Sequence, residues 1–426
     1  MFFNPRVRSA GYGVVYYKGV IMQIKPFAAL RPAPEKAAAV ASVPYDVVDT
    51  AEARALADGN PDSFLHVSRP EIDLPTDVDI HDDRVYAQGL KAFKAFQADG
   101  VLGREAAERF YVYRQIMGAH SQTGVVACCS IDDYAGDIIR KHEKTRKDKE
   151  DDRTRHCLEL NANSGPVFLT YRDTAALDAL VAAVQKGAPL YDFIAVDNIR
   201  HTVWRVEGDA GAWVEAFAQV PLAYVADGHH RAAAAYRSGQ QRRAENPAHT
   251  GAEEYNWFLA VLFPETQLRI LPYNRCVADL NGLTAEAFLQ KVKAVFKTEP
   301  VTGADPAGPR EVRMYFAGAW YRLAWDEFDA DPVGRLDVSV LQDRLLAPVL
   351  GIDDPRTNTR ISFVGGIRGT GELTKRVDAG RDAVAFAMYP VTVAQMMDIA
   401  DAGQIMPPKS TWFEPKLRSG LLVHTL

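Results

Sequence analysis

The sequence predicts an α/β protein of mixed α+β character, with an N-terminal lobe and a C-terminal α/β lobe. At 426 residues the chain is longer than one ordinary domain core requires. Its 47% hydrophobic and 24% charged residues are typical of a globular protein. Short apolar runs bounded by glycine or proline alternate with segments of helical spacing. We therefore predict an extension over residues 1–21, an N-terminal lobe over 22–270 and a C-terminal lobe over 271–426.

The N-terminal lobe is expected to open with a strand at Met22, which the prolines of the following "ALRPAP" end. Apolar residues at helical spacing predict helices over 50–58, 82–99 and 174–185. Runs rich in β-branched and aromatic residues predict strands at 63–67, 109–117, 123–134, 167–171, 191–207 (a hairpin), 222–226 and 257–264.

The second half of the chain has a different pattern, with a surface loop over 301–309. Strands are predicted at 268–280, 311–325 (a hairpin), 361–366 and 383–390. Helices are predicted at 284–296, 338–350, after 370 and from 391. No internal repeat, heptad seam or low-complexity tract interrupts this order.

Charge, hydropathy and cysteine spacing indicate which partners and which cellular compartment to expect. The net charge of −6 provides no general attraction to nucleic acid, and no helix-turn-helix pattern is present, so we expect no specific DNA binding. No apolar stretch approaches the ~20 residues of a membrane span. The four cysteines form no CxxC pair, which indicates reduced thiols. We therefore expect a cytoplasmic protein with neither a membrane nor a specific nucleic-acid partner.

The strongest chemical signal is "ADGHHRAAAAYRS", where a strand over 222–226 is followed by a turn and a helix over 231–238. Gly228 permits a sharp turn, and the start of a helix attracts anions. Arg231 adds a planar cation suited to phosphate, while Asp227 is suited to holding a metal or steering a hydroxyl. Gly228 and His229 are expected to contact the cofactor, and His230 is suited to proton transfer near neutral pH. The alternative is an ordinary capped helix with a satisfied core histidine.

A second candidate is the charged run "IIRKHEKTRKDKEDDR", which contributes His142 and Lys144 as possible phosphate contacts. The plain alternative is a solvated helix with mixed ion pairs. The run contains HE without HExxH, so its spacing excludes a zincin site.

A third candidate is the tail "MPPKSTWFEPK", in which Lys409, Ser410 and Thr411 offer one charge and two hydroxyls to a phosphate. The alternative is a proline-rich turn. No Walker sequence is present. The glycine-rich stretch over 365–371 also has the pattern of a phosphate-binding turn, but an ordinary strand-to-helix connection explains it better.

The DGHHR turn is similar to the D-G-x-H-R turn of the ParB/sulfiredoxin-like superfamily, which includes nucleotide-binding partition proteins and kinases of free serine. From Met22 onward the chain also resembles a bacterial and archaeal family, domain of unknown function 1015. That resemblance rests on "IKPFAALRP", "VPYDVV", "NPDSFLHVSRPEIDLP", "HEKTRKDKEDDR", "NSGPVFLTY", "ADGHHR" and "MPPKSTWFEPKLRSGLL". It implies a ParB/sulfiredoxin-like core in the N-terminal lobe, closed by the 222–239 strand-turn-helix. The glutamate base of the serine kinases matches no motif in this sequence.

Together, the residues and the resemblance predict a nucleotide-dependent phosphotransferase acting on a small hydroxylated metabolite, with free serine as one possibility. The expected cofactors are Mg²⁺, held by Asp227, and a nucleoside di- or triphosphate, with Asp227, His230 and Arg231 as catalytic residues. A non-catalytic nucleotide sensor and a metal-dependent phosphohydrolase are the alternatives. If a triphosphate binds, the segments 142–147, 227–231 and 409–411 are expected to line one cleft, because several phosphate charges need donors from several elements.

Overall fold

The computed structural model describes residues 6–7, 16–17, 21–327 and 330–426, and it confirms a mixed α/β fold. Most of the predicted extension, 1–21, lies outside the described residues. The chain divides into two compact units. The first comprises the described residues up to Lys141, Thr145–Leu268 and Pro415–Leu426. The second comprises His142–Lys144 and Arg269–Glu414. The last twelve residues thus differ from the predicted 271–426 lobe, since their backbone pairs with the first unit, as in Ser419 with Ser42.

The first unit is built on a nine-stranded mixed sheet in the order β11-β12-β6-β7-β14-β10-β13-β8, with β3 paired to β7. β10 runs parallel to β14 and antiparallel to β13, while β6 and β7, which overlap the strands predicted at 109–117 and 123–134, form an antiparallel hairpin. The strands of this sheet are β3 (Ile24–Lys25), β6 (Tyr111–Met117), β7 (His120–Ser130), β8 (Ile139–Arg140), β10 (Val167–Tyr171), β11 (Tyr191–Ile194), β12 (Arg200–Arg205), β13 (Ala223–Asp227) and β14 (Trp257–Pro264). Smaller strands pair outside it: β1 (Arg6–Val7) with β2 (Tyr16–Tyr17), β4 (Leu30–Pro32) with β5 (Leu102–Arg104), and β9 (Ala162–Asn163) with β23 (His424–Thr425).

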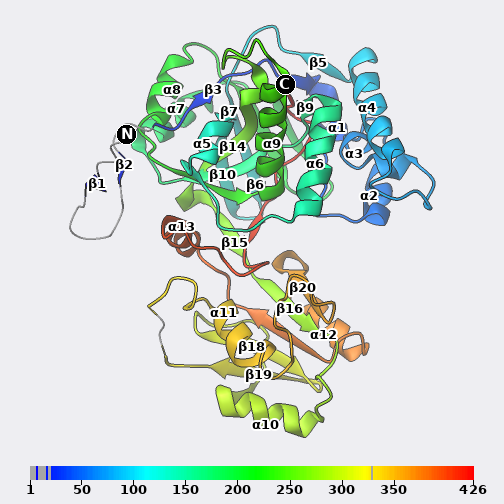
Figure 1. Ribbon diagram of the computed structural model, residues 1–426, viewed down its shortest axis with the longest axis vertical. Coiled ribbons are helices and arrows are strands. Elements are labelled where there is room, and N and C mark those ends of the chain that lie inside the picture. Colours follow the sequence, from blue (N-terminus) through cyan, green and yellow to red (C-terminus); the bar gives the residue numbers. More distant parts are fainter. Residues whose placement is uncertain (1–5, 8–15, 18–20, 328–329) are drawn as a thin grey trace. The chain divides into compact units, whose positions relative to one another are not determined.

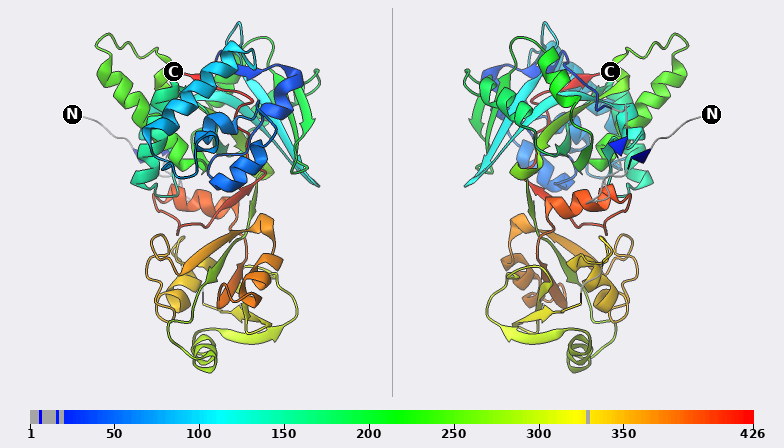
Figure 2. Two further views of the ribbon diagram at one scale, coloured as in Figure 1. Left: turned by 90° about the vertical axis from the view of Figure 1, so that its right-hand side faces the viewer. Right: turned by 90° about the vertical axis from the view of Figure 1, so that its left-hand side faces the viewer.

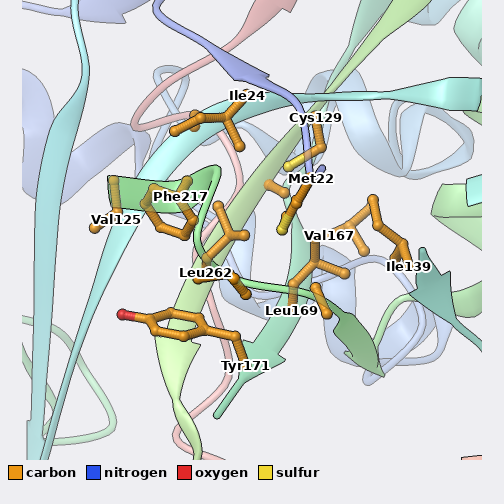
Figure 3. Close-up of a cluster of buried hydrophobic side chains, with 14 of the residues drawn as sticks. Met22, Ile24, Val125, Cys129, Ile139, Val167, Leu169, Tyr171, Phe217 and Leu262 are labelled. Atoms are coloured by element: carbon orange, nitrogen blue, oxygen red, sulfur yellow. The ribbon is translucent and has the colours of Figure 1, made fainter. Parts of the chain in front are cut away.

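Helices cover this sheet and bury its apolar runs. α9 lies beside α6, and α4, which packs with α3, lies on the other side of α6 (Figures 1 and 2). The helices of the first unit are α1 (Ala37–Val40), α2 (Thr50–Ala57), α3 (Leu65–Ser68), α4 (Asp83–Ala98), α5 (Ile131–Ala135), α6 (Lys147–Leu160), α7 (Ala175–Val184), α8 (Gly211–Phe217) and α9 (His229–Glu245). Figure 3 shows the main core, where Val125, Leu169 and Leu262 of the sheet meet Phe217 of α8. This core fixes the strand ends that carry the site.

One predicted strand is a helix. Residues 63–67 lie mostly in α3, where the N–H groups of Val67 and Ser68 both donate to the Phe64 carbonyl, at 3.0 Å. A short apolar run does not by itself distinguish a strand from a buried helical turn. The packing of Phe64 and Val67 against α4 decides between them.

The second unit contains a six-stranded antiparallel sheet in the order β17-β19-β18-β21-β16-β20. Its strands are β16 (Tyr273–Val277), β17 (Lys297–Val301), β18 (Glu311–Phe316), β19 (Ala319–Ala324), β20 (Ile361–Gly365) and β21 (Val384–Met388), with a separate pair of β15 (Arg269–Leu271) and β22 (Trp412–Glu414). Its helices are α10 (Ala285–Val295), α11 (Asp337–Leu341), α12 (Gly371–Asp378) and α13 (Val393–Asp401). The helix predicted over 338–350 is shorter, because a π-helical turn over Gln342–Leu346 follows α11. No helix among the described residues has the length and apolar character needed to cross a bilayer.

A buried histidine in the large sheet makes the stability of the first unit depend on pH. The Tyr113 hydroxyl lies 2.7 Å from Nδ1 of His201, and both residues are buried. Burial, together with the charge of Arg418, lowers the pKa of His201 to about 2. The unfolded chain therefore binds more protons than the folded one below pH ~6.5, so acidification destabilises the fold.

We expect the free energy of unfolding to fall by up to about 1.4 kcal/mol per pH unit through His201 as the pH drops below ~6.5. In a His201→Gln variant, the free energy of unfolding should fall with decreasing pH by about 1.4 kcal/mol per pH unit less, because one fewer proton binds on unfolding. Urea unfolding at a series of pH values between 7 and 4 measures this difference. Equal slopes for the two proteins would contradict the assignment.

Candidate functional site

The predicted strand-turn-helix is present in the first unit. β13 ends at Asp227, Gly228 adopts a left-handed conformation with φ 90°, and α9 begins at His229. A Cβ atom on Gly228 would lie 2.9 Å from Nε of Arg231, so the guanidinium occupies the space that a side chain would need. The alanine row after the turn, 232–235, is buried against the core. Helix α9 is longer than the predicted 231–238, and no side chain caps it at Gly228.

Asp227 is held between two cations. Nη2 of Arg231 donates to one carboxylate oxygen at 2.8 Å, and Nζ of Lys416 donates to the other at 3.1 Å. The side chains of Arg231 and Lys416 are each 9% exposed. Burial acts to raise the pKa of Asp227, but the charges of Lys416 and Arg231 outweigh it and hold that pKa well below its ordinary value. The carboxylate is therefore ionised throughout the neutral range.

Lys416 is the main residue of this site that the sequence prediction missed. It lies in the terminal segment that rejoins the first unit, where Gln115 Nε2 donates to its carbonyl at 2.8 Å. Gln122 Nε2 donates to the neighbouring Pro415 carbonyl at 3.4 Å, and Arg418 pairs with Asp197. These contacts fix the backbone that presents Lys416. The only sequence signal was its place in "FEPKLRSG", within a stretch that carries the family resemblance.

The two histidines of the turn have different surroundings. His229 is 7% exposed, and burial lowers its pKa to about 4, although Asp227 acts in the opposite direction. His230 Nε2 accepts a hydrogen bond from the backbone N–H of Arg146 at 3.2 Å, so this nitrogen carries no proton in that contact. Arg146 of the charged run therefore meets the turn within the first unit. Helix α6, which follows Arg146, carries surface ion pairs such as Lys147–Asp151. The alternative interpretation of the run, a solvated helix with mixed ion pairs, predicted such pairs.

Two further segments surround Arg231. Nη1 of Arg231 donates to the Pro166 carbonyl, and the segment "VPYDVV" lies nearby. Burial acts to lower the pKa of Arg231, but the charges of Asp46 and Asp227 raise it. Tyr45 adjoins the same place, and burial raises its pKa above the ordinary value. Arg231 is therefore a fixed cation, oriented by its surroundings before any ligand arrives.

The second unit holds other predicted residues. His142 is buried, its carbonyl accepts from the backbone N–H of Met406 at 2.8 Å, and its Nε2 lies 3.4 Å from Oγ1 of Thr411. Two of the predicted segments thus meet within this unit. Lys144 is exposed.

The remaining tail residues form a turn of the kind that the alternative predicted. Ser410 is buried and its Oγ donates to the Pro407 carbonyl at 2.6 Å. Lys409 is exposed, has φ 57°, and its Nζ lies 5.7 Å from the centre of the Tyr273 ring. The convergence of this tail with the DGHHR turn at one phosphate remains a prediction.

As arranged here, the carboxylate of Asp227 does not fit the Mg²⁺ ligand expected from the sequence. Each of its oxygens already accepts from a cation, and a dication would be placed beside Lys416 and Arg231. What the cluster fits is an anion that competes with Asp227 for these two cations.

The fold and this cluster define a mixed α/β protein with a cationic turn at a helix start. The chain belongs to the family described as Protein of unknown function (DUF1015), whose model matches residues 24–339. No curated protein matches its sequence.

Among solved structures, the chain is similar to SbnI with a C-terminal truncation from Staphylococcus aureus, at 12% identity and a TM-score of 0.37, over 70% of this chain and 86% of that one. It is also similar to a free serine kinase in complex with AMP, at 11% identity and a TM-score of 0.35, over 70% and 91%. A third is a conserved hypothetical protein from Pyrococcus furiosus, at 12% and 0.34, over 70% and 94%.

Proposed function

We propose that the protein is a nucleotide-dependent phosphotransferase that acts on a small hydroxylated metabolite, with free serine among the first acceptors to test. The observation that carries the proposal is the cluster at the start of α9, where Lys416 and Arg231 hold Asp227. A helix N-terminus, a lysine and an arginine at one turn form a site that favours phosphate oxygens.

In this proposal a nucleotide phosphate competes with Asp227 for its two cations. As Lys416 turns toward the phosphate oxygens, one oxygen of Asp227 becomes available to accept a hydrogen bond from the acceptor hydroxyl. Gln115 keeps the Lys416 backbone in place during this exchange. Catalysis then consists mainly of positioning and charge neutralisation, as is usual in phosphoryl transfer.

Phosphoryl transfer forms one bond to phosphorus and breaks another. The acceptor oxygen bonds to the terminal phosphorus, while the bond from that phosphorus to the bridging oxygen breaks and the nucleotide leaves with the electron pair. We assign the hydroxyl proton to Nε2 of His230, at the start of α9, which must release the Arg146 N–H to accept it. Asp227 is a poor base because its pKa is low, so its role is to orient the hydroxyl.

One observation favours the alternative of a nucleotide sensor without turnover. Both oxygens of Asp227 are occupied by cations, and this arrangement is stable without any acceptor. If Arg231 and Lys416 stay on Asp227 when a nucleotide binds, no carboxylate oxygen is available to orient a hydroxyl. The protein would then report nucleotide binding and transfer nothing.

The test is incubation of the purified protein with ATP, ADP or CTP, Mg²⁺ and a panel of hydroxylated metabolites that includes serine, followed by phosphorus NMR. Mg²⁺ is supplied because nucleotide phosphates bind it themselves. We expect a phosphorylated acceptor, and an Asp227→Asn variant should form it at least ~100-fold more slowly, in line with the loss of a group that acts in the transition state.

The matched control is Asp209→Asn, because this carboxylate accepts from the Gly211 N–H in an exposed turn of the same unit. It should react at the wild-type rate. Inorganic phosphate without a modified acceptor would indicate a phosphohydrolase instead. Binding without any product would indicate the sensor.

A further inference from the structure

A small pocket lies in the first unit between α3, α6, α9 and the terminal segment. Its volume is about 40 Å³. The polar residues of its lining, which we call the polar wall, are Tyr45, Ser68, Arg153, His156, Asn163, Ser164, Arg231 and Ser419. The apolar residues, which we call the apolar wall, include Cys157, Val167, Ala234 and Phe258.

The polar wall offers donors without a competing acid. Two guanidinium groups and three serine residues line it, and no aspartate or glutamate of the described residues does so. Each guanidinium already has a carboxylate partner outside the lining: Asp152 lies 2.7 Å from Arg153, and Asp227 pairs with Arg231. Asp46 also acts on Arg231 and Lys416 on Asp227, and these two further charges have opposite signs. The surroundings are thus close to neutral, which suits a ligand with a single negative charge better than a phosphate with two or more.

Ser68 gives this pocket an unused polar group. The residue is 4% exposed, and its Oγ has no hydrogen-bond partner among the described residues. A buried hydroxyl without a partner is costly, and a ligand or water in the pocket removes that cost. Arg153 is held in a fixed orientation, because its guanidinium lies 4.2 Å from the centre of the Tyr45 ring. The donors are therefore placed before a ligand enters.

We propose that this pocket binds the carboxylate end of a small monocarboxylate. At ~10–15 Å³ per water-sized group, it holds about three to four such groups, which matches the two oxygens and two carbons of a carboxylate and the carbon attached to it. The carboxylate faces Arg153, Arg231 and the Ser68 hydroxyl, and the first carbon faces the apolar wall. A triphosphate does not fit this volume. The inference goes beyond the proposed function, since it requires neither a nucleotide nor phosphoryl transfer.

The test is binding of acetate and glycolate to the full chain in a carboxylate-free buffer, measured by saturation-transfer NMR and calorimetry without nucleotide. We expect saturable binding of both, with acetamide, the neutral analogue of acetate, at least tenfold weaker. Ser68→Ala should weaken acetate binding at least fivefold. Ala234→Val fills the apolar wall and should abolish binding. Ser238→Ala is the matched control, because this buried serine on α9 donates to the Thr154 carbonyl and lies outside the lining.

Three results would overturn the site: equal affinity for acetate and acetamide, tighter binding of inorganic phosphate than of acetate, or unchanged acetate binding in Ser68→Ala. If Ala234→Val fails to fold, the Ser68→Ala comparison still decides. None of these binding experiments contains a nucleotide. If the protein proves to transfer no phosphoryl group, the acetate-binding result therefore still stands.

Discussion

Replacing Lys416 with methionine is expected to weaken nucleotide binding at least ~100-fold and to destabilise the first unit by about 1.5–3 kcal/mol. Methionine keeps most of the apolar stem and removes the charge. Asp227 would then keep only Arg231 as a cationic partner, although its carboxylate remains ionised and largely covered. Removing one of the two cations leaves the charge of Asp227 less fully compensated and removes a hydrogen bond to a charged group. Calorimetric titration with ATP measures the loss of nucleotide binding, and urea unfolding measures the loss of stability.

The matched control is Lys186→Met, an exposed lysine in the same unit beyond the end of α7. We expect it to bind nucleotide and unfold like the wild type. The two effects also separate the roles of Lys416. If Lys416→Met loses stability but binds ATP normally, the lysine supports only the fold. If both variants behave alike in both assays, the cluster has neither role.

The local pattern around the turn was readable from the sequence because it depends on neighbouring residues. Tyr224 and Val225 favour a strand, the alanines that follow favour a helix, and a glycine between them permits the turn. Strand β13 and helix α9 have that order. The segment 63–67 shows the limit of the same reasoning, since its apolar run suits both states and tertiary packing chooses the helix.

The pairing of Asp227 with Lys416 could not be predicted from neighbouring residues. Lys416 lies 189 positions from Asp227 along the chain, and no local pattern distinguishes it from Lys409, which the sequence prediction chose. What places Lys416 there is a set of long-range contacts, above all the Gln115 side chain on its carbonyl. A glutamine within a strand gives no sign in one sequence of which backbone it will bind. Such contacts depend on the completed sheet.

Gly228 provides the most specific test of how the turn orients Arg231. Replacing it with alanine is expected to lower the free energy of unfolding by about 2–4 kcal/mol and to weaken ATP binding at least tenfold. Part of the cost is the left-handed backbone, which disfavours a side chain by about 1–2 kcal/mol. The remainder arises because the new Cβ would meet Arg231 at 2.9 Å from Nε and 3.0 Å from Cζ. To relieve that contact, the guanidinium must leave Asp227.

Gly208→Ala separates these two costs. Gly208 has φ 97°, close to the 90° of Gly228, and a Cβ atom there would have nothing within 4 Å. We expect this variant to lose only the ~1–2 kcal/mol of backbone strain and to bind ATP like the wild type. Urea unfolding and calorimetry on both variants give the difference between them, which measures the displacement of Arg231. Equal losses in both proteins would show that Gly228 matters only for its backbone conformation, and that Arg231 can move without affecting the site.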